Sequence, residues 1–204
     1  MIDIVIVGDM NDTTKACIST LKNNYYDNKL FVVPFEGYNK SLNNGAKKGD
    51  NKYIAFCNND LEFTYGWDRI VDLFMFDDRV VSASPWCPKT HRQWWGNEIP
   101  KEIVIGTQTG KIVAGWCLVL KRSWWEEMGG FDERMEFYCC DNSYTMQLEA
   151  AGKKHALVPG SEVIHTQSVT LNTLKGTPRY EQLTRGEVKK FNRLYNQNLF
   201  GWGT

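Results

Sequence analysis

The sequence predicts an α/β fold, with a mostly parallel sheet flanked by helices in a single compact domain that carries a C-terminal helical tail. Apolar runs typical of strands alternate with helix-like segments through the first half of the chain, and this alternation favours a parallel sheet covered on both faces. The chain has 204 residues, of which 42% are hydrophobic and 13% aromatic. A chain of this size and composition can bury one substantial core, so we expect one domain rather than two.

The elements of the first half follow from hydrophobic periodicity and from helix start signals. Residues 2–8 form an apolar run that ends in glycine, and Asp12 begins a helix with apolar positions through Leu21. Further along, we predict a strand over 30–35, a polar helix over 37–49, a strand over 52–57 and a helix over 67–76.

The second half of the chain is less regular. Its predicted elements are strands over 80–83 and 103–105 around a loop at 84–100, a strand over 111–120, helices over 122–128 and 141–151, and short strands over 156–158 and 162–164. Residues 168–178 are polar and rich in Thr, Asn and Gly, which indicates a linker to a final helix around 180–195. Phe200 and Trp202 are then available to pin the end of the chain.

Charge and hydropathy indicate which partners the protein can attract and in which compartment it is expected. The 24 Lys and Arg residues balance 24 Asp and Glu residues, so no overall field attracts nucleic acid or anionic lipid. The longest apolar stretch, 112–120, is too short to span a bilayer, and the N-terminus lacks the features of a signal peptide. We therefore expect a soluble, cytoplasmic protein with no membrane span.

The six cysteines lie mostly within apolar strand or helix patterns, and the sequence has no CxxC spacing. We expect them to be reduced, buried thiols. The adjacent pair Cys139 and Cys140 could instead serve redox or metal chemistry, but no second cluster in the sequence partners it.

The most informative segment is the strand at 52–57 together with the polar turn after it. Asn58, Asn59 and Asp60 follow the strand directly, and Glu62 adds a second carboxylate. Ligands of α/β sheets collect beyond the carboxyl ends of strands, and Mg²⁺ or Mn²⁺ is commonly held by one or two carboxylates together with substrate phosphates. The same residues suit a plain Asn-rich turn, so the segment alone leaves both interpretations open.

Two longer blocks carry a resemblance. The first runs from Gly37-Tyr38 through Asn43 and Gly45 to YIAFCNND, and the second contains GWCLVLKRSWWEEMGGFDERMEFYCCDNSY, an AGKK turn and VPGSEVIH, which ends at His165. In order and spacing these blocks resemble family-2-type nucleotide-sugar glycosyltransferases of the GT-A fold, in the branch whose metal motif reads Asn-Asn-Asp. The similarity covers roughly residues 2–170.

The resemblance implies a metal site and a sugar donor. Asp60 would bind the Mn²⁺ or Mg²⁺ that bridges the diphosphate of a nucleoside-diphosphate sugar, where the cation neutralises charge on the leaving phosphate. His165 matches a position that often supplies another metal ligand, and a neutral imidazole suits such ions. Without the resemblance, a single histidine at a strand end would be read as structural or solvated.

The resemblance also implies a general base. Asp141 falls at the family's base position, at the start of the predicted helix 141–151, where a carboxylate would accept the proton of an acceptor hydroxyl and apolar neighbours would raise its pKa. The alternative role is a helix cap, which is compatible with catalysis. The family's carboxylate before the base is Cys140 here, and its acidic residue two beyond is Ser143, which thins the acidic cluster on the acceptor side.

The nucleotide side departs further from the family. Met10, in Gly8-Asp9-Met10-Asn11, replaces the tyrosine of the usual Pro-Thr-Tyr-Asn, so an aromatic contact with the base is lost. Asp9 or Glu36 could read the base edge, or either could be an exposed loop charge. Asn43 is the best-supported contact with the diphosphate or ribose, because an amide both donates and accepts. The full set of expected donor contacts is Gly8, Asp9, Glu36, Asn39, Asn43, Asn58 and Asn59.

Tryptophans supply the candidate acceptor contacts. Trp94 and Trp95 lie in a polar loop with His91, where a lid or an acceptor platform would be expected, and Trp116 is a further candidate. Trp124 and Trp125 are expected in the core.

We therefore expect a metal-dependent glycosyltransferase that acts by direct displacement with inversion. The donor half would span about 1–84, the acceptor half about 85–170, and 171–204 would form a linker and tail. The acceptor is open between a saccharide, a protein and a hydroxymethylated DNA base. Two alternatives are a nucleotidyltransferase, although the first loop is neither basic nor Gly-rich, and a non-catalytic sugar- or nucleotide-binding module.

Overall fold

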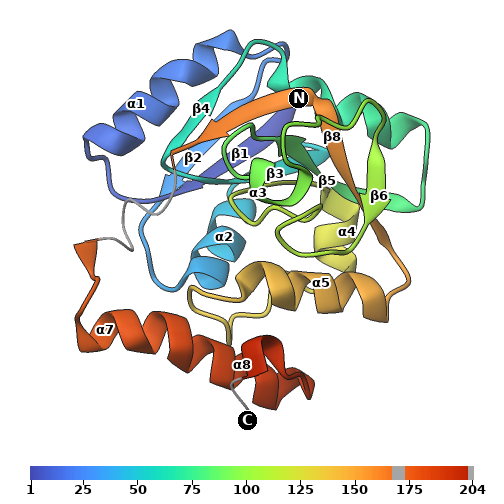
Figure 1. The fold of residues 1–204 in the computed structure, drawn as a ribbon. Coiled ribbons are helices and arrows are strands. Elements are labelled where there is room, and N and C mark those ends of the chain that lie inside the picture. Colours follow the sequence, from blue (N-terminus) through green and yellow to red (C-terminus); the bar gives the residue numbers. More distant parts are fainter. Residues whose placement is uncertain (167–172, 202–204) are drawn as a thin grey trace.

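The computed structural model describes residues 1–166 and 173–201. Within these residues an eight-stranded sheet runs through the middle of the molecule in the order β2-β1-β3-β7-β5-β8-β4, with β6 paired to β8 beside this path (Figure 1). The strands are β1 (Ile2–Val7), β2 (Lys29–Val33), β3 (Tyr53–Asn58), β4 (Leu61–Phe63), β5 (Val80–Trp86), β6 (Val104–Gly106), β7 (Cys117–Lys121) and β8 (Lys154–His165).

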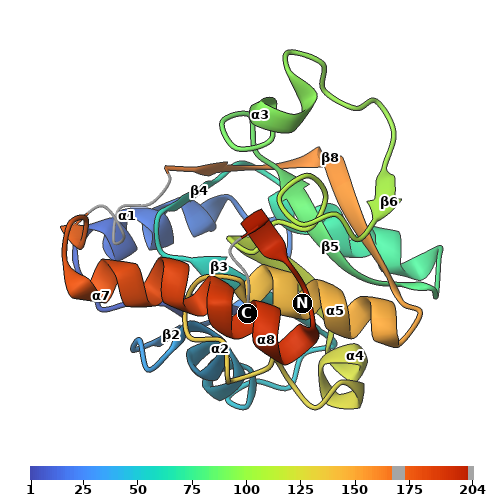
Figure 2. The same ribbon diagram turned by 60° about the horizontal axis from the view of Figure 1, so that its bottom comes forward.

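Helices cover both faces of this sheet. The helical elements are α1 (Asp12–Thr20), η1 (Leu21–Asn23), α2 (Tyr38–Ala46), η2 (Trp67–Met75), α3 (Arg92–Trp95), α4 (Arg122–Glu127), α5 (Cys140–Ala150), α7 (Pro178–Glu181), η3 (Gln182–Gly186), α8 (Glu187–Tyr195) and η4 (Leu199–Gly201). α1 and η2 pack on one face, and α2, α4 and α5 pack on the other. The run from α7 to α8 crosses in front of α5 and α2 as an outer layer (Figure 2).

Strand direction decides which residues meet at the edge of the sheet. β1, β2 and β3 are parallel, β7 is antiparallel to both β3 and β5, and β5 is parallel to β8. Because Cys57 near the end of β3 pairs with Cys117 at the start of β7, the residues after β3 lie beside the residues before β7.

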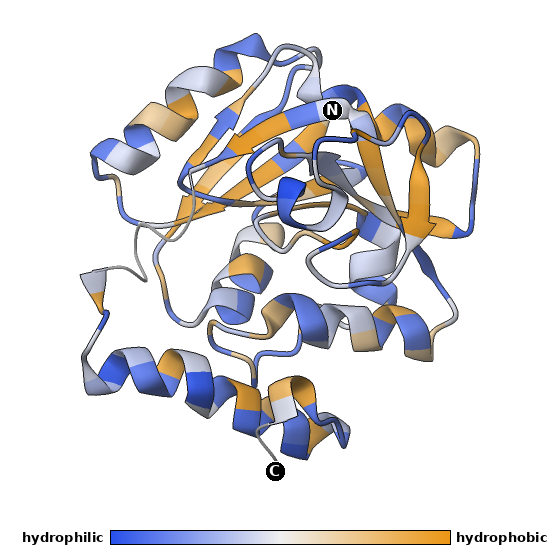
Figure 3. Ribbon diagram, viewed as in Figure 1, coloured by the Kyte–Doolittle hydropathy of each residue, from blue (hydrophilic) through white to orange (hydrophobic). Residues whose placement is uncertain are grey.

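The core follows from the alternation of side chains along these strands. In β1, Ile4 and Ile6 join the apolar cluster under α1 and η2, whereas Val5 and Val7 join the cluster under α2, α4 and α5. Figure 3 shows the hydrophobic strands between helices whose outward parts are hydrophilic. Both faces of β1 are thus buried, which explains its continuous apolar sequence.

The predicted α/β class is confirmed, and several local predictions need correction. The expected strand at 111–120 starts only at Cys117, because the preceding residues form turns in which Gly110 N donates to Val113 O. The two short strands at 156–158 and 162–164 are one strand, β8, with a register shift beside β5 near Pro85. β4 was missed, and β7 makes the sheet mixed.

The expected helices differ in detail from those observed. The helix at 67–76 is a 3₁₀ helix, and the final helix contains a π-helical turn between α7 and α8. Trp202 and the first part of the expected linker, residues 168–172, lie outside the described residues. Across residues 1–166 and 173–201, every helix is too short or too polar to span a bilayer.

A buried ion pair joins three segments on the α4 side. Asp3 of β1 is fully buried and accepts hydrogen bonds from Asn51 N at 2.9 Å, Asn51 Nδ2 at 2.8 Å and Arg122 Nη2 at 2.6 Å. Arg122 also donates to the Asn51 and Ala46 carbonyl oxygens. All three guanidinium nitrogens of Arg122 are therefore hydrogen-bonded only while these segments stay together.

Substituting Asp3→Ala should lower the free energy of unfolding by about 3–5 kcal/mol, because it leaves a nearly buried guanidinium without its counter-charge. Urea denaturation measures this change. Arg79→Ala is the control, because the guanidinium of Arg79 is exposed and its pair with Asp77 should contribute little. Equal unfolding midpoints for the two variants would contradict the assignment.

Candidate functional site

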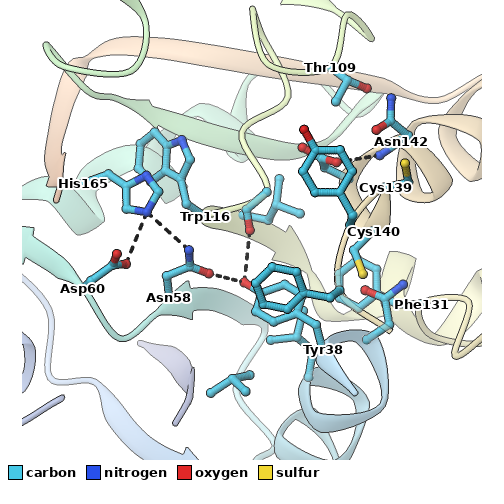
Figure 4. Close-up of a pocket in the computed structure, with 18 of the residues that line it drawn as sticks. Tyr38, Asn58, Asp60, Thr109, Trp116, Phe131, Cys139, Cys140, Asn142 and His165 are labelled. Atoms are coloured by element: carbon cyan, nitrogen blue, oxygen red, sulfur yellow. Dashed lines mark hydrogen bonds and ion pairs between the residues drawn. The ribbon is translucent and has the colours of Figure 1, made fainter. Parts of the chain in front are cut away.

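A cavity of about 670 Å³ opens at the carboxyl edge of β1 and β3. Its walls come from the loop after β1, the turn after β3, the segment before β7, the start of α5, the end of β8 and the C-terminal residues Leu199 and Phe200. Figure 4 shows the side chains that face it. Segments far apart in the sequence therefore contribute to one cavity.

Asp60 and His165 are brought together by the pairing of β4 with β8. Leu61 lies opposite His165 in this ladder, and Thr166 N donates to Asp60 O at 3.0 Å. The side chains are nearly buried, and Asp60 Oδ1 lies 3.2 Å from His165 Nε2. Trp116 stacks on the imidazole, with 5.4 Å between ring centroids (Figure 4).

Asn58 and Tyr38 link this pair to the other side of the cavity. Tyr38 Oη donates to Asn58 Oδ1 at 2.6 Å and lies 3.2 Å from Gly115 O. The amide nitrogen Asn58 Nδ2 lies 3.3 Å from His165 Nε2. With its oxygen taken by Tyr38, Asn58 turns its NH₂ group toward the imidazole (Figure 4).

This arrangement sets the hydrogen-bonding role of the imidazole. An amide nitrogen only donates, so this orientation of Asn58 assigns to His165 the tautomer in which Nε2 accepts and Nδ1 carries the proton, and Nδ1 has no hydrogen-bond partner among the described residues. Nε2 and the carboxylate oxygen Asp60 Oδ1 are then two acceptors 3.2 Å apart, and Oδ1 has no hydrogen-bond partner in the described part of the chain. Two acceptors placed this close together, His165 Nε2 and Asp60 Oδ1, are suited to binding a cation between them.

The chain itself offers few ligands for such a cation. Among the described residues no group of three or more His, Cys, Asp and Glu could hold a metal ion. Asp60 and His165 supply two ligands, and the open cavity beside them leaves room for others. This pattern fits Mn²⁺ or Mg²⁺, which commonly complete their shells with water and substrate phosphate oxygens.

Asp141 faces the cavity from the first turn of α5. The helix follows Cys139, whose φ of 62° is left-handed. Asn142 N donates to Asp141 Oδ1 at 2.9 Å, and burial raises the pKa of the Asp141 carboxyl. A Cβ at Gly115 would lie 2.8 Å from the Asp141 Cβ, so only glycine allows this close approach.

The loop after β1 forms the opposite wall. A Cβ at Gly8 would lie 2.7 Å from Asn59 Nδ2, and that amide donates to Thr14 Oγ1 at 3.0 Å. Thr14 Oγ1 in turn donates to Asp9 O at 2.6 Å. Asn59 thus holds the loop closed against the turn after β3, and Asp9 is exposed at the cavity.

Several sequence-predicted donor contacts face the cavity. Gly8, Asp9, Asn39, Asn58 and Asn59 all line it. Asn39 is almost fully buried, and its Nδ2 donates to Asp132 O at 2.9 Å.

Asn43 and Glu36 do not line the cavity in the described structure. Asn43 Nδ2 donates to Phe131 O at 2.9 Å, and Asn43 Oδ1 accepts from Phe131 N at 2.9 Å and from Trp125 Nε1 at 3.2 Å. Its amide is therefore used to hold the loop before α5. Glu36 is exposed and pairs with Lys40 at 3.2 Å. This geometry does not favour a donor contact for either residue.

The three tryptophans predicted on the acceptor side lie in three different places. Trp94 is 52% exposed, lines the cavity and packs against Gly110. Trp95 donates from Nε1 to Lys111 O at 3.2 Å and does not line the cavity in the described structure. Trp116 contacts His165 and so belongs to the metal side.

Sequence reasoning missed an aromatic wall. Its aromatic members come from the segment after β2, the loop before α5 and the end of the chain, and they are Phe35, Phe137, Tyr138 and Phe200, with Leu199 beside them. α8 fixes this wall through the buried Glu187, whose Oε2 accepts from Glu136 N at 2.7 Å. In the sequence these residues are visible only as aromatic residues, and the exposure of Phe35 and Tyr138 is seen only in the structure.

Both a family model and a solved structure match the chain. Residues 2–135 match the family described as "Glycosyl transferase family 2". A solved structure, the mannosyltransferase PcManGT from Pyrobaculum calidifontis in complex with GDP-Man and Mn²⁺, is 12% identical, with a TM-score of 0.66. The match covers 96% of this chain and 64% of that chain. The likeness shows a shared fold, the GT-A fold expected above. No curated protein matches the sequence.

The six thiols should be inert in the folded protein. All six cysteines are free and buried, and burial raises the pKa of Cys17 and of Cys139 to about 12 and that of Cys140 well above its usual range. We expect negligible reaction with DTNB at pH 8 and reaction of six thiols per chain after unfolding in guanidinium. Fast labelling of native protein would support the redox alternative for Cys139 and Cys140.

Proposed function

Because the chain belongs to glycosyl transferase family 2, we propose that it moves a sugar from a nucleoside-diphosphate donor to an acceptor hydroxyl in a metal-dependent reaction. The observation that carries the proposal is the shared cavity, which Asp60 and His165 face from one side and Asp141 from the other. A displacement reaction needs leaving-group activation and a proton acceptor in separate positions around one sugar.

The metal side would hold the donor diphosphate. Asp60 Oδ1 and His165 Nε2 are the proposed ligands of Mn²⁺ or Mg²⁺, and the related mannosyltransferase was solved with GDP-Man and Mn²⁺. When bound, the cation supplies positive charge for the leaving diphosphate. Gly8, Asp9 and Asn59 would hold the nucleotide from the loop after β1, with Asn39 and Asn58 on the adjoining wall.

Asp141 would act as the general base. Its Oδ1 is held by the Asn142 amide, so the carboxylate has a fixed direction when it takes the proton of the acceptor hydroxyl. Burial raises its pKa, which makes it a stronger base than a solvated aspartate. A base on the acceptor side, opposite the leaving group, supports inversion at the anomeric carbon.

The acceptor would enter beside Trp94 and the aromatic wall. Exposed rings offer apolar faces with which the C–H groups of a sugar can pack. A saccharide therefore suits this entrance better than a protein side chain or a hydroxymethylated base, although all three present a hydroxyl. The buried free thiols also suit a reducing compartment such as the cytoplasm.

Family membership weighs against a nucleotidyltransferase. The thinned acidic cluster around Cys140 and Ser143 leaves a non-catalytic binding module as the second candidate. Such a module would bind donor and metal without transferring sugar, so variants of Asp60 and Asp141 distinguish the two.

Asp60→Ala should abolish both the Mn²⁺-dependent binding of nucleoside diphosphate and the transfer of sugar, because it removes a proposed metal ligand. The fold should be retained, because Asp60 Oδ1 has no hydrogen-bond partner to lose in the described structure. Isothermal titration with Mn²⁺ and nucleoside diphosphate, beside a transfer assay, measures the loss. Glu62→Gln is the matched control, two residues along the chain and exposed. Full activity of Asp60→Ala, or of wild type in EDTA, would refute the metal assignment.

Asp141→Asn should lower single-turnover transfer by roughly 10²–10⁴ with donor and Mn²⁺ affinity retained, because the amide cannot take the proton. In wild type the base is active only as carboxylate, so transfer should be lost as pH falls through the raised pKa of Asp141.

Glu149→Gln, an exposed change further along α5, is the control for the Asp141 experiment. If Asp141 serves only the helix terminus, Asp141→Asn should keep normal transfer with a stability loss of at most about 1 kcal/mol. That outcome would place the base elsewhere.

A further inference from the structure

We propose that Asn58 competes with the divalent cation for the electron pair of His165, and that Tyr38 holds Asn58 in the competing orientation. The inference rests on the proposed metal site. It assigns to Asn58, the first residue of the Asn-Asn-Asp turn, the role of a positioning residue that sets cation affinity rather than that of a ligand.

The orientation of the Asn58 amide follows from its partners. Tyr38 Oη donates to Asn58 Oδ1 at 2.6 Å, which directs Nδ2 toward His165 Nε2 at 3.3 Å (Figure 4). Burial raises the pKa of Tyr38 well above its usual value, so the phenol keeps the proton that it donates. With Oδ1 held by Tyr38, the amide presents its NH₂ group to the imidazole.

Competition follows from the chemistry of the imidazole. Nε2 has one electron pair in the plane of the ring, and that pair accepts a hydrogen bond from Asn58 or binds a cation, but not both. In the tautomer assigned from the Asn58 amide, the pair accepts from Asn58, while the neighbouring Asp60 Oδ1, 3.2 Å from Nε2, has no hydrogen-bond partner within the described residues. Cation binding would satisfy both acceptors and release the Asn58 NH₂ group.

The position of the His165 ring does not depend on Asn58 alone. Trp116 stacks on the ring with an interplanar angle of 23°, and the backbone amide of His165 donates to Cys87 Sγ at 3.3 Å. Removing the Asn58 side chain should therefore free the electron pair while the ring stays in place.

Release of Asn58 also links the cation to the donor. Asn58 lines the cavity, so a freed N–H can donate to a diphosphate oxygen that enters beside the cation. Since each ligand then favours the same released state of Asn58, their binding should be mutually reinforcing. In a variant without the amide, this part of the coupling disappears.

The test is a titration of Mn²⁺ followed by the EPR signal of the free ion, with and without nucleoside diphosphate. We expect Asn58→Ala to bind Mn²⁺ alone about 2- to 10-fold more tightly than wild type, which corresponds to one net hydrogen bond. Tyr38→Phe should shift the affinity in the same direction by less, because the amide is retained but no longer oriented. Asn97→Ala, at an exposed asparagine outside the cavity, is the control and should leave Mn²⁺ affinity unchanged.

The outcomes separate this inference from the proposed function. Weaker or unchanged Mn²⁺ binding in Asn58→Ala, with normal binding in wild type, would overturn the competition while leaving the metal site intact. Absence of Mn²⁺ binding to wild type, with and without nucleoside diphosphate, would refute the metal site and the inference together. Asn58→Ser, whose hydroxyl is too short to reach His165, serves as the second variant if Asn58→Ala does not fold.

Discussion

The site depends on the antiparallel insertion of β7 between β3 and β5. In an all-parallel sheet the residue before a strand lies at the edge opposite to the residue after its neighbour. Because β7 is reversed, Gly115 and Trp116 lie beside the turn after β3, and Asn58 N donates to Trp116 O at 2.9 Å. One reversal of direction therefore puts the segment that approaches Asp141 next to the segment that carries Asp60.

A second constraint acts on the loop of residues 131–139, which leads into α5 and Asp141. From one side, Asn43 bonds both backbone groups of Phe131. From the other, Glu187 of α8 accepts from Glu136 N, and Tyr195 donates to Asp132. Buried carboxylates are costly unless they are fully bonded, so Glu187 is stable only while this loop keeps its path. α8 thus supports the position of Asp141 although it is distant in sequence.

The sequence was sufficient for the strands whose ends carry the site, because β1 and β3 are buried on both faces and read as continuous apolar runs. It also indicated Asp60 and His165 through the resemblance, and the structure brings these two together. It could not reveal the role of Tyr38, whose partners Asn58 and Gly115 lie 20 and 77 residues away. Nor could it separate Asn43 from the donor contacts, since an amide that binds backbone and one that binds phosphate look identical in sequence.

The π-helical turn between α7 and α8 bears on how the tail tolerates changes in length. Glu187 N donates to Gln182 O, five residues back, and this wider turn aligns the buried Leu183 with the buried Val188. In a regular α-helix, residues five apart point about 140° from each other. The turn thus accommodates one additional residue in the helix. Deletion of that additional residue would rotate α7 about the helix axis, while α8 would keep its contacts with the 131–139 loop. Insertions and deletions before Glu187 can therefore be absorbed without moving Asp141.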